Sequence, residues 1–323
     1  MARNRIYFGM LIFVLVTIIV WTSYSMLNVG KKEGSHKISV IVNNSNDERW
    51  IALRQGLEQA AKDYDLDLNY VFTGEFKNLE EELEMVSREI EGGAEGIIIQ
   101  MVFSGDLARE IPEFETDTKI VLIESDLAAE GIHTYVGPDN HEIGKALAEA
   151  VLEEYGETLA QKRVGILSGN QRQYAMQQRL AGLKEGLEAA APEIVWILDK
   201  NEAQAETEGQ AGICDSLDFV IALGNRETEQ MADYMQIQEG IENCLLYGVG
   251  CSEKAVYYLD KGMIQTLVVP NEFNMGYQSM EIIGEQLKYH WENTKGSQID
   301  YLVIHKGNLY DTENQKVLFP IVQ

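Results

Sequence analysis

The sequence predicts an α/β fold with two doubly wound, mostly parallel sheets, preceded by one apolar N-terminal helix. Strand-like and helix-like segments alternate from residue 38 to the C-terminus, and most strand-like segments are continuous runs of Val, Ile and Leu. Alternating units of this kind build parallel sheets with right-handed crossovers. The strands are too numerous for one typical sheet, which favours two sheets of five or six strands. A barrel of eight βα units is the alternative, and it requires two of the expected strands to be absent.

The first βα unit is the clearest in the chain. An apolar run, Ile38–Val42, stops at a polar loop, 43–48, and an amphipathic helix follows. The apolar face of that helix carries Trp50, Leu53, Leu57, Ala60 and Tyr64, at spacings of three, four, three and four. This pattern is typical of a buried parallel strand followed by a helix that crosses back over the sheet.

The later elements are predicted from the same two periodicities. The expected strands are 67–72, 96–101, 119–124, 134–137, 163–168, 194–198, 218–223, 245–249, 265–269 and 301–305. The expected helices include 79–91, 142–155 with Asn140 as its N-cap, a helix through Met176 and Leu187, and 273–291.

The N-terminus carries a segment long enough to cross a membrane. Tyr7–Leu27 contains no charged residue, and at ~1.5 Å per residue it spans about 31 Å, close to the hydrocarbon core of a bilayer. Its length and the lack of an Ala-x-Ala site favour an uncleaved membrane anchor, although Ser23-Tyr24-Ser25 is a passable signal-peptide cleavage site. Either interpretation places the rest of the chain outside the cytoplasm, in the cell envelope.

The composition excludes several classes of function. A net charge of −26 repels phosphate backbones and anionic lipids, so we expect no nucleic-acid binding. The histidines are scattered without ligand spacing, and the three cysteines are predicted to be free thiols, so no metal and no cofactor is expected. Walker, nucleophile-elbow and dinucleotide-binding patterns all fail, and no catalytic constellation is recognisable. We therefore do not expect an enzyme.

Ligands of open α/β sheets bind beyond the carboxyl ends of the strands. The loop after the first strand is therefore a candidate site, and it offers Asn44, Asn46, Arg49 and Trp50. An aromatic ring among amides and charges suits a small polar ligand with an apolar face, such as a sugar. The alternative is that the loop is solvated and that Trp50 belongs to the apolar face of its own helix.

The order and spacing of these segments resemble the type I periplasmic binding proteins, the ribose-binding group whose fold is shared with the core of lactose-repressor-type regulators. The resemblance covers residues 37 to the C-terminus and rests on KISVIVNNSNDERW, GGAEGIIIQ, KIVLIESD, YVGPDNHEIGKALAEAVL, RVGILSGN, DFVIALGNRE and YGVGCSEKAVYYLDKGMIQTLVVPNEFNMGY. It implies two lobes joined by three crossings, with a ligand between them. Lobe one would comprise 38–139 and 271–302, and lobe two 140–270 and 303–323, after an anchor and tether at 1–37.

The resemblance also implies ligand contacts in the first lobe. Trp50 stands where these proteins stack an aromatic ring on the sugar, and Arg49 stands where a second aromatic is frequent. The usual Asp-Arg pair after the fourth strand is replaced by Glu124-Ser125, followed by Asp126.

The second lobe departs further from the family pattern. The usual arginine near the first helix of that lobe aligns with Gln177, and Arg179 follows. Asn225 is a shifted counterpart of the Asn-Asp pair, and Pro270 replaces a glutamine. The Gly-Phe-Asp-Gly turn reads Gly248-Val249-Gly250-Cys251, so its ligand-binding aspartate is absent. The fold is therefore predicted more firmly than the ligand.

Two functions are compatible with the resemblance. The first is an extracytoplasmic solute-binding protein that captures a small, carbohydrate-like ligand for an ABC importer. The second is a membrane-anchored sensor subunit that signals to a histidine kinase or chemoreceptor. The lack of a cysteine near the end of the apolar segment excludes a lipoprotein and keeps the second function open.

Overall fold

A computed structural model describes residues 15–17, 35–106, 117–128, 134–199, 213–214, 216–238, 244–289 and 296–319. The expected membrane segment, Tyr7–Leu27, lies outside these residues apart from a helical fragment at 15–17. Among the helices of the described residues, none is both long and apolar enough to cross a membrane. Residues from Lys37 onward form one compact unit.

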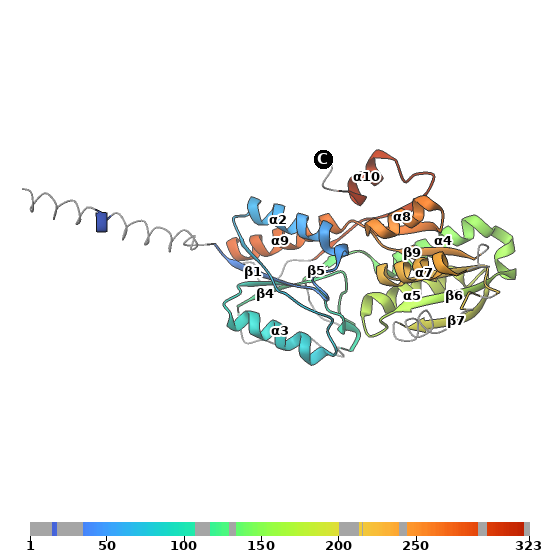
Figure 1. Cartoon of the computed structure of the whole chain (residues 1–323). Coiled ribbons are helices and arrows are strands. Elements are labelled where there is room, and N and C mark those ends of the chain that lie inside the picture. The colour runs from blue at the N-terminus through green and yellow to red at the C-terminus, as the bar shows by residue number, and fades with distance from the viewer. Residues whose placement is uncertain are drawn as a thin grey trace, which may run out of the picture. The chain divides into compact units, whose positions relative to one another are not determined.

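The compact unit contains two six-stranded sheets, and we call the part of the chain built on each sheet a lobe (Figure 1). The sheet of lobe one has the order β11 (Ser297–Gln298), β5 (Thr134–Gly137), β4 (Lys119–Ile123), β3 (Gly96–Ile99), β1 (Lys37–Ile41), β2 (Asp67–Tyr70). The sheet of lobe two has the order β12 (Tyr301–His305), β10 (Ile264–Pro270), β9 (Leu245–Val249), β8 (Phe219–Ala222), β6 (Arg163–Gly169), β7 (Glu193–Asp199). All neighbouring strands are parallel except β10 and β12.

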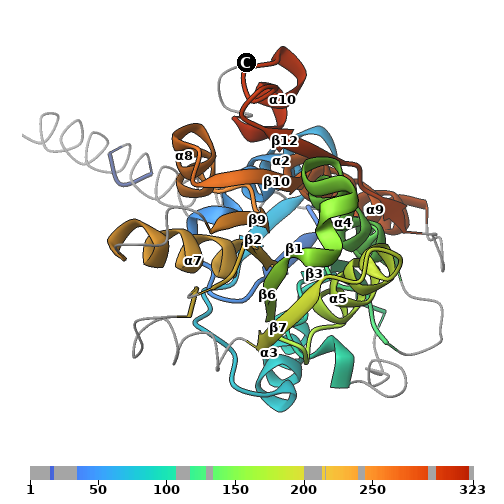
Figure 2. The same cartoon turned by 90° about the vertical axis from the view of Figure 1, so that its right-hand side faces the viewer.

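Helices cover both faces of each sheet. Those of lobe one are α2 (Ile51–Asp63), α3 (Leu79–Glu91) and α9 (Glu272–Tyr289), with 3₁₀ turns at Glu48–Trp50 and Ser104–Asp106. Those of lobe two are α4 (Asn140–Tyr155), α5 (Tyr174–Leu187), α7 (Asn225–Ile237), α8 (Glu253–Lys261) and α10 (Thr312–Leu318), with a 3₁₀ turn at Gly156–Gln161. Figure 2 shows α4 and α5 on one side of the second sheet and α7 and α8 on the other. The prediction of two doubly wound sheets is confirmed, and the single barrel is excluded.

The chain passes between the sheets three times. It leaves the first sheet after Gly137, returns after Pro270 into α9, and leaves again between Gln298 and Tyr301. The sequence did not predict the two-residue strand β11, which is too short to show a periodic pattern.

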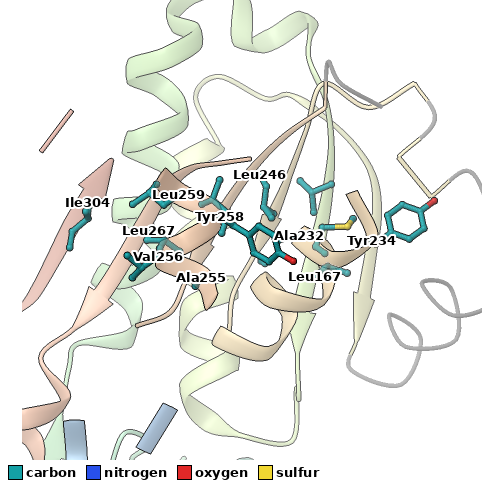
Figure 3. Close-up of a cluster of buried hydrophobic side chains, with 14 of the residues drawn as sticks. Leu167, Ala232, Tyr234, Leu246, Ala255, Val256, Tyr258, Leu259, Leu267 and Ile304 are labelled. Carbon is teal, nitrogen blue, oxygen red and sulfur yellow. The ribbon is translucent and has the colours of Figure 1, made fainter. Parts of the chain in front are cut away.

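The core lies on both faces of both sheets, as expected for buried parallel strands. In lobe two, Val256 and Leu259 of α8 and Ala232 of α7 pack on Leu246 and Leu267 of the sheet (Figure 3). The four strand residues of β8 are all buried. Continuous apolar runs in the sequence therefore correspond to strands that are covered on both faces.

Two helix pairs pack closely through glycine and thereby fix the site described below. A Cβ on Gly56 of α2 would lie 2.0 Å from the carbonyl oxygen of Phe273 in α9, and one on Gly276 would lie 2.2 Å from that of Leu53. In lobe two, a Cβ on Gly182 of α5 would lie 1.9 Å from the carbonyl oxygen of His141 in α4. These contacts leave no room for a side chain, and they bring the N-terminal parts of α2 and α9 together.

Candidate functional site

The site is centred on Glu124, which directly follows β4 at the carboxyl edge of the first sheet. Its backbone φ of 62° is left-handed, a conformation that costs a non-glycine residue roughly 1–2 kcal/mol. Only 7% of its surface is exposed. A strained and buried carboxylate of this kind is typical of functional sites, where the surrounding contacts hold it in place.

Three side chains from different elements converge on the Glu124 carboxylate. Its Oε2 accepts hydrogen bonds from Arg49 Nη2 at 2.7 Å and from Gln100 Nε2 at 2.7 Å. Its Oε1 lies 3.9 Å from Nη2 of Arg179, which belongs to α5 of lobe two. Glu124 is therefore charge-paired with a guanidinium from each lobe.

Arg179 is held in place by lobe two. Its Nε donates to Asn140 Oδ1 at 2.8 Å, and its Nη1 donates to the carbonyl oxygen of Leu223 at the end of β8. Asn140 Nδ2 in turn donates to the Glu124 carbonyl oxygen at 2.8 Å. The prediction that Asn140 caps α4 is wrong, because the N-cap is Asp139, whose side chain accepts from the backbone of His141 and Glu142. Asn140 is thereby free to join the two lobes.

The electrostatics of the cluster follow from burial and pairing. Burial opposes ionisation of Glu124, but Arg49 and Arg179 hold its pKa below the usual value. Burial likewise lowers the pKa of Arg179, whereas Glu124 keeps the pKa of Arg49 above its ordinary value despite burial. All three groups are therefore charged, as a buried ion cluster requires.

Glu272 adds a second buried carboxylate to this cluster. It opens α9 directly after the crossing from β10, and burial raises its pKa to about 7 against the opposing charge of Arg49. Among the described residues, its Oε2 has no hydrogen-bond partner, and neither has Nε of Arg49. Burial and the neighbouring Glu272 carboxylate raise the pKa of the Cys251 thiol, which lies on the loop after β9 of lobe two.

Trp50 lies beneath the cluster. Its ring is 1% exposed and packs in the core between α2 and the first sheet. Its Nε1 donates to the carbonyl oxygen of Asn43 at 3.1 Å, and the guanidinium of Arg49 lies 3.8 Å above its ring. The face that a sugar ring could stack on is therefore covered by Arg49.

The remaining predicted site residues are more widely placed. Asn44, with a left-handed φ of 49°, and Asn46 are exposed on the loop after β1. Gln177 donates to the carbonyl oxygen of Gln171 at the edge of the lobe interface. Asn225 is buried, and its Oδ1 accepts from the backbone nitrogen of Cys251 at 3.2 Å. Of the predicted set, the structure brings together Arg49, Trp50, Glu124 and Arg179, and Asn225 positions the loop beside them.

Two cavities lie beside this cluster and share residues with it. A cavity of about 370 Å³ lies near the crossings and is lined by Asp126, Tyr135, Asn140, His141, Tyr174 and Gln298, among others. A second, of about 300 Å³, lies between α2 and the edge strand β2 and is lined by Asn46, Trp50, Arg54 and Phe72, among others. Asp126 therefore faces the first cavity rather than the Glu124 cluster.

The two lobes contact each other next to the cluster. Asn170 Nδ2 donates to the carbonyl oxygen of Val102, and Ser125 Oγ accepts from the backbone of Ala175 at 3.0 Å. Arg172 and Asp106 form an ion pair across the same interface. Because Glu124 and Arg179 are almost fully buried in this arrangement, the lobes must separate before a ligand can reach them.

Sequence reasoning missed three members of the cluster. Gln100 follows β3 at the same carboxyl edge as Glu124, so the rule used for the first loop could have identified it. Asn140 was interpreted as a helix cap. Glu272 is almost 150 residues from Glu124, and no local pattern indicates that they meet. Among the described residues, no group of three or more His, Cys, Asp or Glu side chains could hold a metal ion.

The match to a known family decides what kind of protein this is. The model of the periplasmic binding protein domain matches residues 38–290. The chain belongs to this family. Its members bind ligands and are not enzymes, and membership places the binding domain outside the cytoplasm. The resemblance drawn from the sequence is confirmed.

Solved structures share the fold at low sequence identity. GanP, a glucose-galactose binding protein from Geobacillus stearothermophilus, is 19% identical with a TM-score of 0.74, covering 86% of this chain and 100% of GanP. The Caulobacter myo-inositol binding protein is 18% identical with a TM-score of 0.76, covering 89% of this chain and 99% of that protein. XylFII in the XylFII–LytSN complex is 20% identical with a TM-score of 0.73, covering 84% and 98%. No curated protein matches the chain in sequence.

Proposed function

We propose that this family member is an extracytoplasmic solute-binding protein that captures a small, polar, carbohydrate-like ligand between its lobes and delivers it to an ABC importer. The observation that carries the proposal is the convergence of Arg49, Glu124 and Arg179 from both lobes at the carboxyl ends of the sheets. Paired charges hold fixed donors and acceptors in position, and hydroxyl groups need both. Similar structures described with glucose and galactose, arabinose or inositol support a sugar-like ligand.

Ligand capture would follow from lobe closure. Separation of the lobes breaks the 3.9 Å contact between Glu124 and Arg179 and exposes both groups to water. A hydroxylated ligand then stabilises the closed form only to the extent that it binds that form more tightly than the open one. Glu124 contributes most to this preference, because hydrogen bonds to a charged group are worth roughly 1.5–3 kcal/mol each.

A thermal-shift screen of the full chain in mild detergent tests this function. The panel contains D-glucose, D-galactose, D-arabinose, D-allose and myo-inositol. A ligand at a hundredfold excess over its Kd should raise the free energy of unfolding by about 2.7 kcal/mol. The Glu124→Gln variant is the matched control and should lose most of the shift caused by the hit. If no member of the panel stabilises the wild-type chain, the carbohydrate assignment is wrong.

A membrane-anchored sensor subunit is the second candidate. It is favoured by the uncharged segment Tyr7–Leu27, which has no cysteine near its end, and by the similarity to XylFII, whose structure is a complex with a second protein. In that case the closed form would be recognised by a histidine kinase or chemoreceptor. Permease and ATPase genes beside this gene would favour import, and histidine-kinase genes would favour sensing.

A further inference from the structure

Two buried polar atoms in the cluster have no hydrogen-bond partner in the part of the chain that the structure describes, and they belong to residues far apart in the sequence. Nε of Arg49 belongs to the turn before α2, and Oε2 of Glu272 belongs to the first turn of α9. The residue Glu272 is 8% exposed. Gly56 of α2 lies against Phe273 of α9, and Gly276 of α9 lies against Leu53 of α2, so this packing brings the N-terminal parts of the two helices together. Arg49 and Glu272 interact electrostatically there.

The two atoms have complementary chemistry. Nε of a guanidinium can only donate a hydrogen bond, and the oxygen of an ionised carboxylate can only accept one. A buried group left without its partner costs roughly 1–3 kcal/mol, and more when it is charged. A single hydroxyl group satisfies both atoms, because it accepts from Nε–H and donates to Oε2.

The charges of the cluster restrict the ligand further. Arg49 and Arg179 are balanced by Glu124 and ionised Glu272, so the four groups sum to zero. An anionic ligand would add an unpaired negative charge beside two carboxylates, and a cationic ligand would be placed beside two guanidiniums. Either imbalance is costly at a buried site.

We propose that one hydroxyl group of the ligand bridges Nε of Arg49 and Oε2 of Glu272, and that this pair makes the site selective for neutral polyhydroxylated molecules over sugar acids and amino sugars. This proposal rests on the proposed function and adds Glu272 to the residues that recognise the ligand. The thiol of Cys251 also interacts with this carboxylate.

The pH dependence of ligand affinity distinguishes a ligand contact of Glu272 from a merely structural role. The groups that face Glu272 are Arg49, Glu124, Cys251 and Arg179, and burial of the carboxyl raises its pKa to about 7. A ligand hydroxyl that donates to the ionised carboxylate favours deprotonation. Ligand affinity should therefore increase between pH 6 and pH 8, over the range in which Glu272 ionises.

The test is calorimetry on the full chain with the sugar that the thermal-shift panel identifies, at pH 6 and pH 8. The wild-type chain should bind at least ~threefold more tightly at pH 8, and Glu272→Gln should bind about tenfold more weakly at pH 8, with no pH dependence. Glu272→Asp keeps the charge and should keep the pH dependence. Arg49→Lys keeps a cation for Glu124 and lacks Nε, so it should weaken binding about as much as Glu272→Gln. The double variant should be little weaker than either single variant, because both remove the same bridge.

Several results would overturn the proposal. Equal affinities for Glu272→Gln and the wild-type chain would do so, as would a pH dependence that survives in Glu272→Gln, or additive losses in the double variant. Binding of D-galacturonate as tight as that of D-galactose would contradict the charge argument. If no sugar in the panel stabilises the wild-type chain, the proposed function fails and this inference fails with it. If a sugar binds the wild-type chain and Glu272→Gln leaves its affinity unchanged, this inference alone is overturned.

Discussion

Replacement of Trp50 by alanine separates two roles of its ring, packing in the core and contact with a ligand. The ring is 1% exposed, its Nε1 donates to the Asn43 carbonyl oxygen, and Arg49 lies 3.8 Å above it. Truncation of a buried tryptophan costs roughly 3–5 kcal/mol. Loss of the hydrogen bond leaves a carbonyl unpaired, which adds about 1 kcal/mol. We expect Trp50→Ala to lower the free energy of unfolding by about 5 kcal/mol.

The assay is urea denaturation of the ligand-free variants, beside calorimetric affinity for the sugar found in the screen. Trp50→Phe keeps most of the apolar area and should cost only about 1–2 kcal/mol. Trp196→Ala is the matched control, since Trp196 is half-buried on the edge strand β7 of the other lobe. It should destabilise less and leave the affinity unchanged. A Trp50→Ala variant of normal stability with weakened affinity would refute the packing argument and show that the ring faces the ligand.

Further perturbations have equally definite outcomes. Burial raises the pKa of Glu272 from 4.5 to about 7, so the contribution of this carboxyl to stability is complete below pH 4.5 and is lost as the pH rises to about 7. Glu272→Gln should therefore be more stable than the wild-type chain in urea at pH 8, by at most about 3 kcal/mol. At pH 4.5 the variant should show no gain in stability. Arg179→Ala removes one of the two guanidiniums beside Glu124 and the donor of both Asn140 Oδ1 and the Leu223 carbonyl oxygen, so it should cost about 3–5 kcal/mol. Arg226→Ala breaks only an exposed pair with Glu75 and should cost less than about 1 kcal/mol. Equal losses in urea would contradict the assigned burial. Small-angle scattering should show a smaller radius of gyration with saturating ligand, and an unchanged radius would argue against lobe closure.

Glu272→Gln is expected to raise stability at pH 8 and to weaken ligand binding, and these two effects have one physical origin. In the ligand-free closed form an unpaired buried carboxylate costs stability, and the same carboxylate stabilises a ligand that supplies the missing hydrogen bond. Such trade-offs between stability and function are common where a site holds a charged group in readiness.

The sequence by itself determined the sheets, the helices and the class of the protein. A continuous apolar run such as Ile97–Ile99 reports burial on both faces of a strand, and helical spacing in 51–63 reports one buried face. These are local properties of the chain, so periodicity alone reveals them. The carboxyl-edge rule likewise located Arg49 and Trp50, and the family resemblance located Glu124.

Only the tertiary structure decided which of these side chains meet. Periodicity shows that Trp50 is on a buried face, but the stacking of Arg49 on its ring, and of both on the first sheet, depends on packing. The left-handed φ of Glu124 is maintained by contacts from Asn140 and Gln100. Glu272 reaches Arg49 because α2 and α9 approach through glycine, across more than 200 residues of chain. A local pattern records how much of a residue is buried, whereas the choice of its partner is made by the fold as a whole.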